Sequence, residues 1–175
     1  MERSNRNGRL FWSVAAAFLL TDVVTKWWAV RSLAPAYTRH EVLGEWLTFT
    51  LLYNPGAAFG LHLGEWSRWI FTALTIGAVV ILTRMYQSTA PGDTVKLTSL
   101  GMILGGAVGN LIDRLRSSQG VVDFIDVGIG DMRWPTFNVA DIGVSCGALV
   151  LAWVLWREDR AAAQSVTASD PSSAR

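Results

Sequence analysis

The chain has 175 residues, about the length of one domain, and a formal net charge of +1. Hydrophobic residues make up 51% of it and charged residues only 17%, against about a quarter in soluble domains. This composition indicates a membrane protein, and the near-neutral charge gives no indication of a nucleic-acid partner. The single cysteine excludes an intrachain disulfide, and the sequence carries no metal or cofactor motif, so we expect neither.

Four apolar segments come near the roughly 20 residues that a helix needs to cross the hydrocarbon core. They are about residues 10–30, 66–86, 95–115 and 139–156. None shows the alternation typical of strands, so we predict an α-helical integral membrane protein with four transmembrane helices. Residues 1–160 would form a single membrane-embedded domain, and the small, polar residues of 161–175 predict a disordered cytoplasmic tail.

The connection between the first two segments, residues 31–65, is long for a link between helices. Its β-branched and aromatic run at 46–53 alternates in part and ends at Asn54-Pro55-Gly56. This pattern predicts one or two short strands lying at the membrane surface.

Basic residues favour an orientation with both termini in the cytoplasm. Arg3, Arg6 and Arg9 precede the first segment, and positive charge next to a spanning helix favours the cytoplasmic side. Over the whole chain the excess of Lys and Arg on that side is small. In this orientation the first and third helices run outward.

Polar residues from separate parts of the chain fall at the same, outer level. Asp22 and Lys26 are four residues apart, so they share a helix face and can pair. They lie roughly 18 and 24 Å along the first segment, at about 1.5 Å per residue. The other members are Asn54 in the outer connection, Asn110, Asp113 and Arg114 near the end of the third segment, and Asn138 and Asp141 at the start of the fourth. Ionisable residues within membrane segments are functional candidates by default.

Two of the acids, Asp123 and Asp141, are candidates for a catalytic pair. Two carboxyl groups that share a site cannot both ionise easily, so one of them keeps a proton. Such a pair supplies a base that activates water and an acid that protonates a carbonyl or a leaving amine, without a metal or a covalent nucleophile. Asp141 lies in the first turn of a helix, where the dipole favours a charged carboxylate, whereas apolar neighbours of Asp123 favour its protonated form. We therefore expect Asp123 to be the member that tends to hold the shared proton.

A further acidic motif, Gly128-Ile129-Gly130-Asp131, matches the GxGD signature of the presenilin-like intramembrane aspartyl proteases. In that family the motif lies within a transmembrane helix and pairs with a Tyr-Asp. Here it lies in a short loop, and the chain contains no Tyr-Asp. We interpret the match as a chance one.

Five segments of the chain form an ordered set of motifs. They are Asp22-Val23-Val24-Thr25-Lys26, Asn54-Pro55-Gly56-Ala57-Ala58-Phe59, the run from Gly105 to Arg114, Val122-Asp123-Phe124, and Phe137-Asn138-Val139-Ala140-Asp141. Together they resemble the bacterial lipoprotein signal peptidases (signal peptidase II), whose motifs include D-x-x-[ST]-K, N-x-G-A-A-F and G-G-x-x-G-N-x-x-D-R. Val23 stands where the family often has Gln, and Ile142 where Ser often follows the second aspartate.

The resemblance implies an aspartyl endopeptidase of the bacterial inner membrane, with a small β-sheet and a short interfacial helix on the outer face. Its substrate would be a prolipoprotein whose cysteine already carries diacylglycerol, cut just before that cysteine. Beyond this substrate and membrane lipid no partner is implied, and we expect a monomer. The implied roles are catalysis for Asp123 and Asp141, substrate binding or support of the dyad for Asn54, Gly56, Asn110, Arg114 and Asn138, and bracing of the site for Asp22, Lys26 and Asp113.

Two other classes of function remain as alternatives. A proton-coupled transporter could use Asp22, Lys26, Asp113 and Asp141 as a relay, but it would spread ionisable residues through the depth of the membrane, and the inner half holds none. A four-helix assembly factor without catalysis would tolerate Asp123→Asn and Asp141→Asn.

Overall fold

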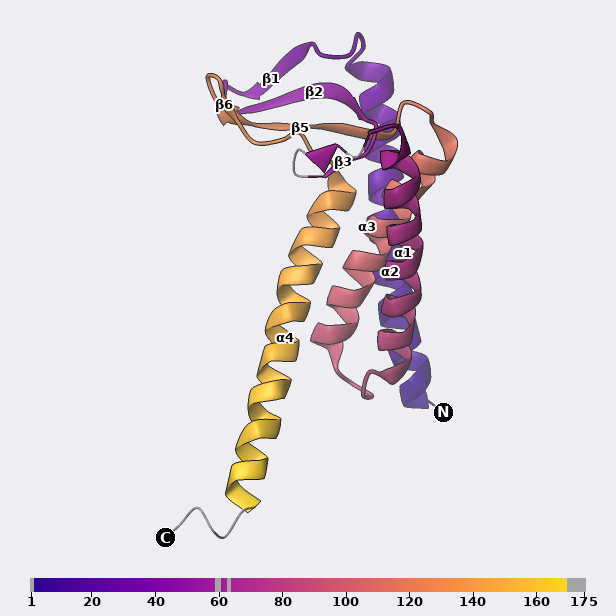
Figure 1. The fold of residues 1–175 in the computed structure, drawn as a ribbon, viewed down its shortest axis with the longest axis vertical. Helices are drawn as coiled ribbons and strands as arrows, with labels where there is room; N and C mark the ends of the chain where they lie inside the picture. Colours follow the sequence, from indigo (N-terminus) through magenta and orange to yellow (C-terminus); the bar gives the residue numbers. More distant parts are fainter. Residues whose placement is uncertain (1, 59–60, 63, 170–175) are drawn as a thin grey trace.

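The computed structural model describes residues 2–58, 61–62 and 64–169. Within these residues, four long helices stand side by side and a small sheet lies across one end of them (Figure 1). The helices are α1 (Glu2–Ser32), α2 (Ser67–Ser88), α3 (Thr94–Arg116) and α4 (Val139–Ser169). Each of these four contains a segment long and apolar enough to cross a membrane, which confirms the predicted fold class.

Two helices are longer than predicted. Helix α1 begins at Glu2 rather than near residue 10, and α4 continues to Ser169. The expected disorder from residue 161 onward is therefore wrong for residues 161–169. The run 161–164, Ala-Ala-Ala-Gln, consists of strong helix formers, which let the helix continue beyond its apolar segment. Residues 170–175 lie outside the described part of the chain.

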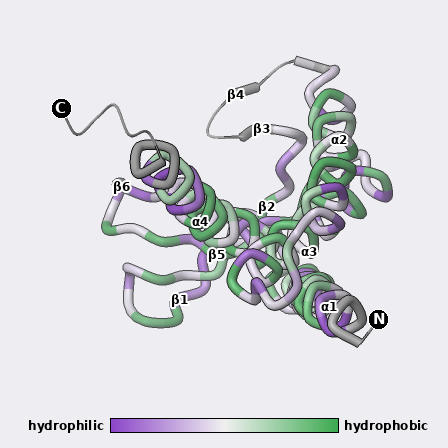
Figure 2. Tube along the Cα trace, turned by 90° about the horizontal axis from the view of Figure 1, so that it is seen from below, coloured by the Kyte–Doolittle hydropathy of each residue, from purple (hydrophilic) through white to green (hydrophobic). Residues whose placement is uncertain are grey.

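Helix α3 lies at the centre of the bundle and packs against α1, α2 and α4 (Figure 2). Its glycines make this close packing possible. A Cβ atom at Gly105 would collide with the carbonyl oxygen of Ala15 in α1, and one at Gly106 with that of Ala140 in α4. These glycines therefore let two helices approach α3 backbone to backbone.

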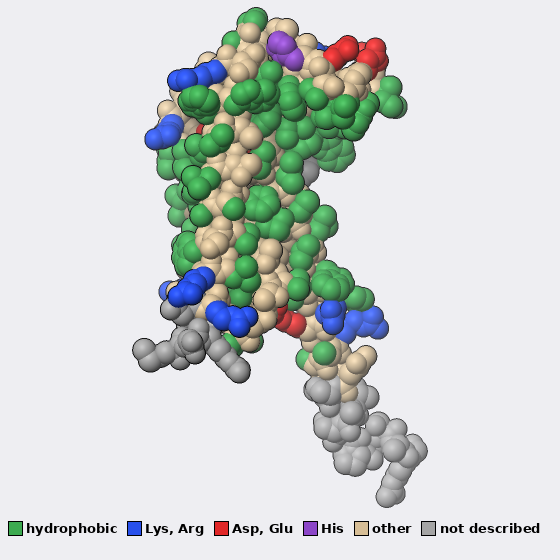
Figure 3. Space-filling view, turned by 180° about the vertical axis from the view of Figure 1, so that it is seen from behind, with side chains coloured by type: hydrophobic (Ala, Val, Ile, Leu, Met, Phe, Trp, Pro, Cys, Tyr) green, Lys and Arg blue, Asp and Glu red, His purple; other side chains and the backbone are tan. Residues whose placement is uncertain are grey.

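The outer surface of the helices is apolar. Figure 3 shows hydrophobic side chains along the length of the bundle, with Lys and Arg side chains toward its two ends. Large hydrophobic side chains such as Leu20, Leu74 and Leu149 are exposed there. Exposed side chains of this kind fit contact with lipid rather than with water.

The sheet at the other end of the bundle is antiparallel, in the order β1-β2-β5-β6. Its strands are β1 (Arg39–Leu43), β2 (Leu47–Asn54), β5 (Val121–Ile129) and β6 (Met132–Arg133). A second, two-stranded sheet pairs β3 (Ala57–Ala58) with β4 (Leu61–His62), and a single 3-10 turn (Gly64–Trp66) precedes α2. The strand predicted at 46–53 is confirmed as β2.

Strand β5 was not predicted from the sequence. Residues 121–124 are buried on both faces of the strand, so they show no alternation of apolar and polar side chains. Val122 and Phe124 pack with Ala29 and Leu33 at the end of α1 and with Leu51 of β2. This apolar cluster holds β5, and with it Asp123, at the sheet end of the helices.

Candidate active site

Asn138, at the start of α4, joins the two candidate aspartates. Its backbone N–H donates to Oδ2 of Asp141 at 3.1 Å, and its side-chain Oδ1 accepts from the Asp141 N–H at 3.0 Å. This reciprocal pair is a capping box, which confirms Asn138 as the N-cap. The Asn138 side-chain amide also donates to Oδ1 of Asp123 at 2.7 Å. One fully buried residue thus orients both carboxyl groups.

Asp123 is buried near the start of β5, with 2% of its surface exposed. Its second oxygen, Oδ2, accepts a hydrogen bond from the side-chain amide of Asn54 at 3.1 Å. Among the described side chains, no Lys, Arg or His forms an ion pair with it. Burial, followed by the charge of Asp141, raises the pKa of Asp123 to about 7, although the hydrogen bonds from Asn54 and Asn138 act in the opposite direction.

Gly56 positions Asn54 from the turn that follows β2. Its N–H donates to Oδ1 of Asn54 at 3.0 Å, and this fixes which face of the amide is turned toward Asp123. Gly56 has φ +119°, a conformation that other residues rarely adopt, and a Cβ atom there would lie 3.0 Å from Oγ of Ser67. The Ser67 hydroxyl in turn donates to the Gly56 carbonyl oxygen.

Asn110, on α3, links Asp141 to a buried cluster of charges. Its side-chain amide donates to Oδ1 of Asp141 at 2.8 Å. Its Oδ1 accepts from Nζ of Lys26 at 2.7 Å and from the Asn138 side chain at 3.1 Å. Since an ammonium can only donate, the Asn110 oxygen must face Lys26 and its NH2 group must face Asp141.

Lys26 contacts three side chains in this cluster. Besides Asn110, Nζ lies 2.8 Å from Oδ2 of Asp22 and 3.0 Å from Oδ2 of Asp113. The pairing of Asp22 with Lys26 that the four-residue spacing predicts is therefore confirmed. Both Lys26 and Asp22 are buried, so each charge depends on its partners for stabilisation.

The two acids beside Lys26 also hold the elements that carry Asp123 and Asp141. Asp22 Oδ1 accepts from the N–H of Ala140 in α4 at 2.9 Å. Asp113 Oδ2 accepts from the N–H of Val122 in β5 at 3.2 Å. Gly109 leaves room for this arrangement, because a Cβ atom there would collide with the carboxylate of Asp22. The cluster of Lys26, Asp22 and Asp113 thus fixes the strand β5 and the helix α4, which meet at Asn138.

Arg114 is the one predicted site residue that lies outside this hydrogen-bond network. Its guanidinium carbon lies 5.7 Å from the ring centre of Phe71 in α2. Within the described residues its Nε is buried without a hydrogen-bond partner. Its positive charge nevertheless interacts with the carboxyl groups of Asp141, Asp123 and Asp113. The structure therefore places a cation near both aspartates with donor capacity to spare.

Asp126 is a second buried acid of β5, which the sequence analysis missed. Its Oδ1 accepts from Nε of Arg133 at 2.6 Å, and its Oδ2 from the hydroxyls of Thr48 at 3.0 Å and Thr50 at 3.2 Å. Burial alone would raise the pKa of Asp126, but the hydrogen bonds from Arg133 and the threonines outweigh it, so the pKa lies below its usual value. The contact between Arg133 and Asp126 depends on the turn at Gly130, which brings β6 back alongside β5 so that Gly128 pairs with Arg133. Glycine at this turn was the local feature of the sequence that could have indicated it.

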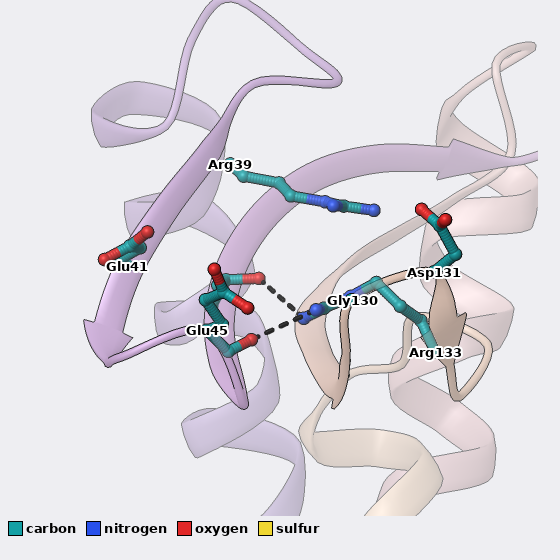
Figure 4. Close-up of a pocket in the computed structure, with 7 residues that line it drawn as sticks. Arg39, Glu41, Glu45, Gly130, Asp131 and Arg133 are labelled. Carbon is teal, nitrogen blue, oxygen red and sulfur yellow. Dashed lines mark hydrogen bonds between the residues drawn. The ribbon is translucent and has the colours of Figure 1, made fainter.

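The GxGD match lies away from the two aspartates. Asp131 is exposed in the turn between β5 and β6, where it lines a polar cavity of about 250 Å³ on the sheet (Figure 4). Arg39, Glu45 and Arg133 line the same cavity, and Arg133 donates to the Glu45 carbonyl oxygen at 3.0 Å. The position of Asp131 agrees with its interpretation as a chance match.

Comparison with known proteins identifies the family of the chain. The family model described as "Signal peptidase (SPase) II" matches residues 14–157. The chain belongs to the signal peptidase II family. This confirms the resemblance of its five motifs, and it excludes the transporter and the assembly factor as alternatives. As a signal peptidase II, the chain is a multi-pass bacterial membrane protein and a peptidase that removes signal peptides from lipoproteins.

Relatives and solved structures resemble this signal peptidase II along most of its length. It is 42% identical over 144 residues to a lipoprotein signal peptidase of Cellvibrio japonicus, covering 81% of this chain and 83% of the relative. A lipoprotein signal peptidase of Burkholderia mallei is 38% identical over 151 residues, covering 85% of this chain and 89% of the relative. A bacterial membrane enzyme solved by the in meso method at 2.3 Å resolution superposes with a TM-score of 0.73 at 28% identity, covering 83% of this chain and 87% of that one.

Proposed function

We propose that Asp123 and Asp141 form the catalytic dyad of this peptidase and that together they activate water. The observation that carries the proposal is that Asn138 donates hydrogen bonds to both carboxyl groups, which are thereby held at one site. The Asn54 side chain donates to the other oxygen of Asp123, Oδ2, and the Asn110 side chain to the other oxygen of Asp141, Oδ1. These amide donors orient the two carboxyl groups, and because amides are neutral they add no positive charge that would ionise both.

The protonation states of the pair follow from their surroundings. Asp123, whose pKa is raised to about 7, holds the shared proton, and Asp141 in the first turn of α4 acts as the base. Asp141 takes a proton from water as the water oxygen attacks the scissile carbonyl carbon, and Asp123 gives its proton to the carbonyl oxygen. When the resulting diol collapses, the proton on Asp141 passes to the leaving amine and Asp123 recovers its own, so the dyad returns to its starting state.

Arg114 supports binding of the substrate in this scheme. Its buried Nε has no partner within the described residues, while its charge interacts with both aspartates. A peptide carbonyl next to the scissile bond would supply the missing acceptor. The cluster of Lys26, Asp22 and Asp113 does not touch the substrate; it holds the start of α4 and of β5 in register.

The depth of the dyad fits a diacylglyceryl-modified prolipoprotein. We place the sheet end of the bundle at the outer face of the bacterial cytoplasmic membrane and both termini in the cytoplasm, because Arg6 and Arg9 precede the apolar part of α1 at the opposite end. A signal peptide that spans the membrane and ends at a cysteine anchored in the outer leaflet would present its scissile bond at this level. All candidate groups come from one chain, so a monomer suffices.

Cleavage assays with matched variants test the dyad. Wild type, Asp123→Asn and Asp141→Asn should be compared on a diacylglyceryl prolipoprotein, with Asp131→Asn as the control. We expect each dyad variant to lose activity by about a thousandfold, as removal of a general acid or base commonly does, and the control to stay near wild type. Full activity of either dyad variant would contradict the proposal. Equal cleavage of the unlipidated precursor would contradict the proposed substrate class.

A further inference from the structure

A groove of about 290 Å³ runs between α1 and α3 at the sheet end of the bundle. The apolar part of its lining comes mainly from the two helices: Val23, Trp27 and Val30 from α1, and Ile112 from α3. The three α1 side chains are exposed at their outer edges. In a spanning bundle this groove opens toward the lipid rather than toward water.

Two arginines line the groove near its membrane-surface end, Arg31 in the last turn of α1 and Arg116 at the end of α3. At about 1.5 Å per residue, α1 rises about 33 Å from Arg9 to Arg31, and α3 about 30 Å from Lys96 to Arg116. Each distance matches the thickness of the hydrocarbon core, about 30 Å. Both guanidinium groups therefore lie at the level of lipid headgroups, while the apolar walls reach down from them.

The charge at this end of the groove is positive and uncompensated. Among the described residues, neither Arg31 nor Arg116 forms an ion pair. The acid that lines the groove, Asp113, is already engaged by Lys26 at 3.0 Å. The guanidinium carbon of Arg31 lies 4.1 Å from the centre of the Trp27 ring, and this stacking orients it at the groove.

We propose that this groove binds one anionic phospholipid, with its phosphate between Arg31 and Arg116 and an acyl chain along the apolar walls. Guanidinium groups match the geometry of phosphate oxygens and form strong charge-assisted hydrogen bonds with them. The groove offers no free carboxylate for the ammonium of a zwitterionic headgroup, which favours an anionic lipid. The site does not depend on the proposed dyad.

The proposed site is distinct from the place where the substrate reacts. Lys26 and Asp113 line the groove, and Lys26 contacts Asn110, which in turn contacts Asp141. Lys26 and Asn110, which are both buried, therefore lie between the groove and Asp141. The diacylglyceryl group of a lipoprotein also carries no phosphate, so the two arginines would have no role in holding it.

Lipid titration of the delipidated full-length chain, followed by native mass spectrometry, tests the site. Phosphatidylglycerol and phosphatidylcholine with identical acyl chains should be compared for wild type and for the double variant Arg31→Gln/Arg116→Gln. We expect one phosphatidylglycerol bound in preference to phosphatidylcholine, and a loss of its affinity of about tenfold in the double variant.

The matched control is Arg157→Gln/Arg160→Gln, in the part of α4 that lies away from the sheet. These arginines also stack on tryptophans, at 4.8 Å from Trp153 and 4.9 Å from Trp156, but they do not line the groove between α1 and α3. We expect the control to retain wild-type affinity. An equal loss of phosphatidylglycerol affinity in both double variants would show that positive charge in general, and not this groove, binds the lipid, and it would overturn the proposal. Equal binding of the two lipids by wild type would also overturn it.

The apolar walls need a test of their own, which leaves the charge unchanged. Val23→Trp should fill the groove and weaken phosphatidylglycerol binding, with an unchanged melting temperature showing that the fold is intact. Soluble glycerol 3-phosphate should fail to displace the lipid at equal concentration. If glycerol 3-phosphate displaced the lipid, the site would recognise the phosphate alone and not the acyl chain, and the lipid proposal would be wrong.

Discussion

Strand β5 carries two buried acids, Asp123 and Asp126, whose surroundings are opposite. They are three residues apart, and since side chains alternate along a strand, they point to different faces of the sheet. Asp126 meets the guanidinium of Arg133 at 2.6 Å, and its pKa lies below the usual value despite its burial. Among the described side chains, Asp123 accepts hydrogen bonds from the amides of Asn54 and Asn138, and burial together with Asp141 raises its pKa to about 7.

The difference shows how one strand can hold a structural and a functional carboxylate. Asp126 is neutralised by a cation, so it stays ionised and ties β5 to β6 and β2. Asp123 is oriented as firmly, but by neutral donors, so its proton remains exchangeable near neutral pH. Burial alone does not distinguish the two acids; the partner does.

The largest expected effect separates the two acids by activity. Asp123→Asn removes the proposed proton donor and should lower the rate of signal-peptide release by about a thousandfold. Asp126→Asn, measured in the same bilayer, should stay within about tenfold of wild type, because Asp126 lies on the other face of the strand. Comparable losses in both variants would mean that the strand as a whole, and not its dyad face, supports activity.

A second contrast lies between the two amides that serve Asp123. Asn138→Ala removes the bond to Asp123 and the helix cap beside Asp141, and we expect a loss of kcat of about a hundredfold. Asn54→Ala removes one donor to Asp123 and should cost about tenfold, as the loss of a single hydrogen bond does. Single-turnover rates for the two variants measure the difference, and a larger loss for Asn54→Ala would contradict the central position of Asn138.

Stability should depend on pH through Asp123. Its pKa is raised in the folded state, so its contribution is fully present below the unfolded value of about 3.8 and is lost as pH rises to about 7. Across that window the wild type should lose at most about 4 kcal/mol from this group, at about 1.4 kcal/mol per pKa unit. Asp123→Asn should flatten the profile of chemical denaturation against pH, and an unchanged slope would place the titrating group elsewhere.

The smallest expected effect concerns the structural acid. Asp126→Asn weakens a buried ion pair and should lower the free energy of unfolding by about 2 kcal/mol. This stability loss, read from denaturation at pH 8, should be larger than that of the exposed neighbour variant Asp131→Asn. If Asp126→Asn and Asp131→Asn lower the free energy of unfolding equally, the contact between Arg133 and Asp126 contributes little to the stability of the fold.

Local spacing in the sequence predicted one part of the site directly. The four-residue separation of Asp22 and Lys26 gave their ion pair, found at 2.8 Å, and the position of Asn138 before an apolar run gave the helix cap. Both contacts lie within a single turn of helix, where spacing determines geometry. The grouping of Asp123 with Asp141 had no such spacing behind it; it was a hypothesis about two carboxyl groups sharing a site, which the resemblance of the five motifs then supported.

Contacts between distant strands could not be predicted in this way. The contacts of Asp126 depend on the pairing of Thr48 with Asp126 across β2 and β5, a register that neither segment encodes alone. Strand β5 escaped prediction because burial on both faces removed its alternation. The length of α4 was underestimated because hydropathy marks only the part of a helix that lies in the membrane. The alanine-rich run at 161–164 lets the helix continue beyond that part, to Ser169.

The most direct test of the central claim is the carboxyl infrared spectrum of the purified enzyme, titrated from pH 4 to pH 9. We predict a protonated carboxyl band that disappears with a midpoint near pH 7, that is absent from Asp123→Asn, and that persists unchanged in Asp126→Asn. A wild type without a band titrating near neutral pH, or a band that survives in Asp123→Asn, would contradict the assignment of the shared proton to Asp123.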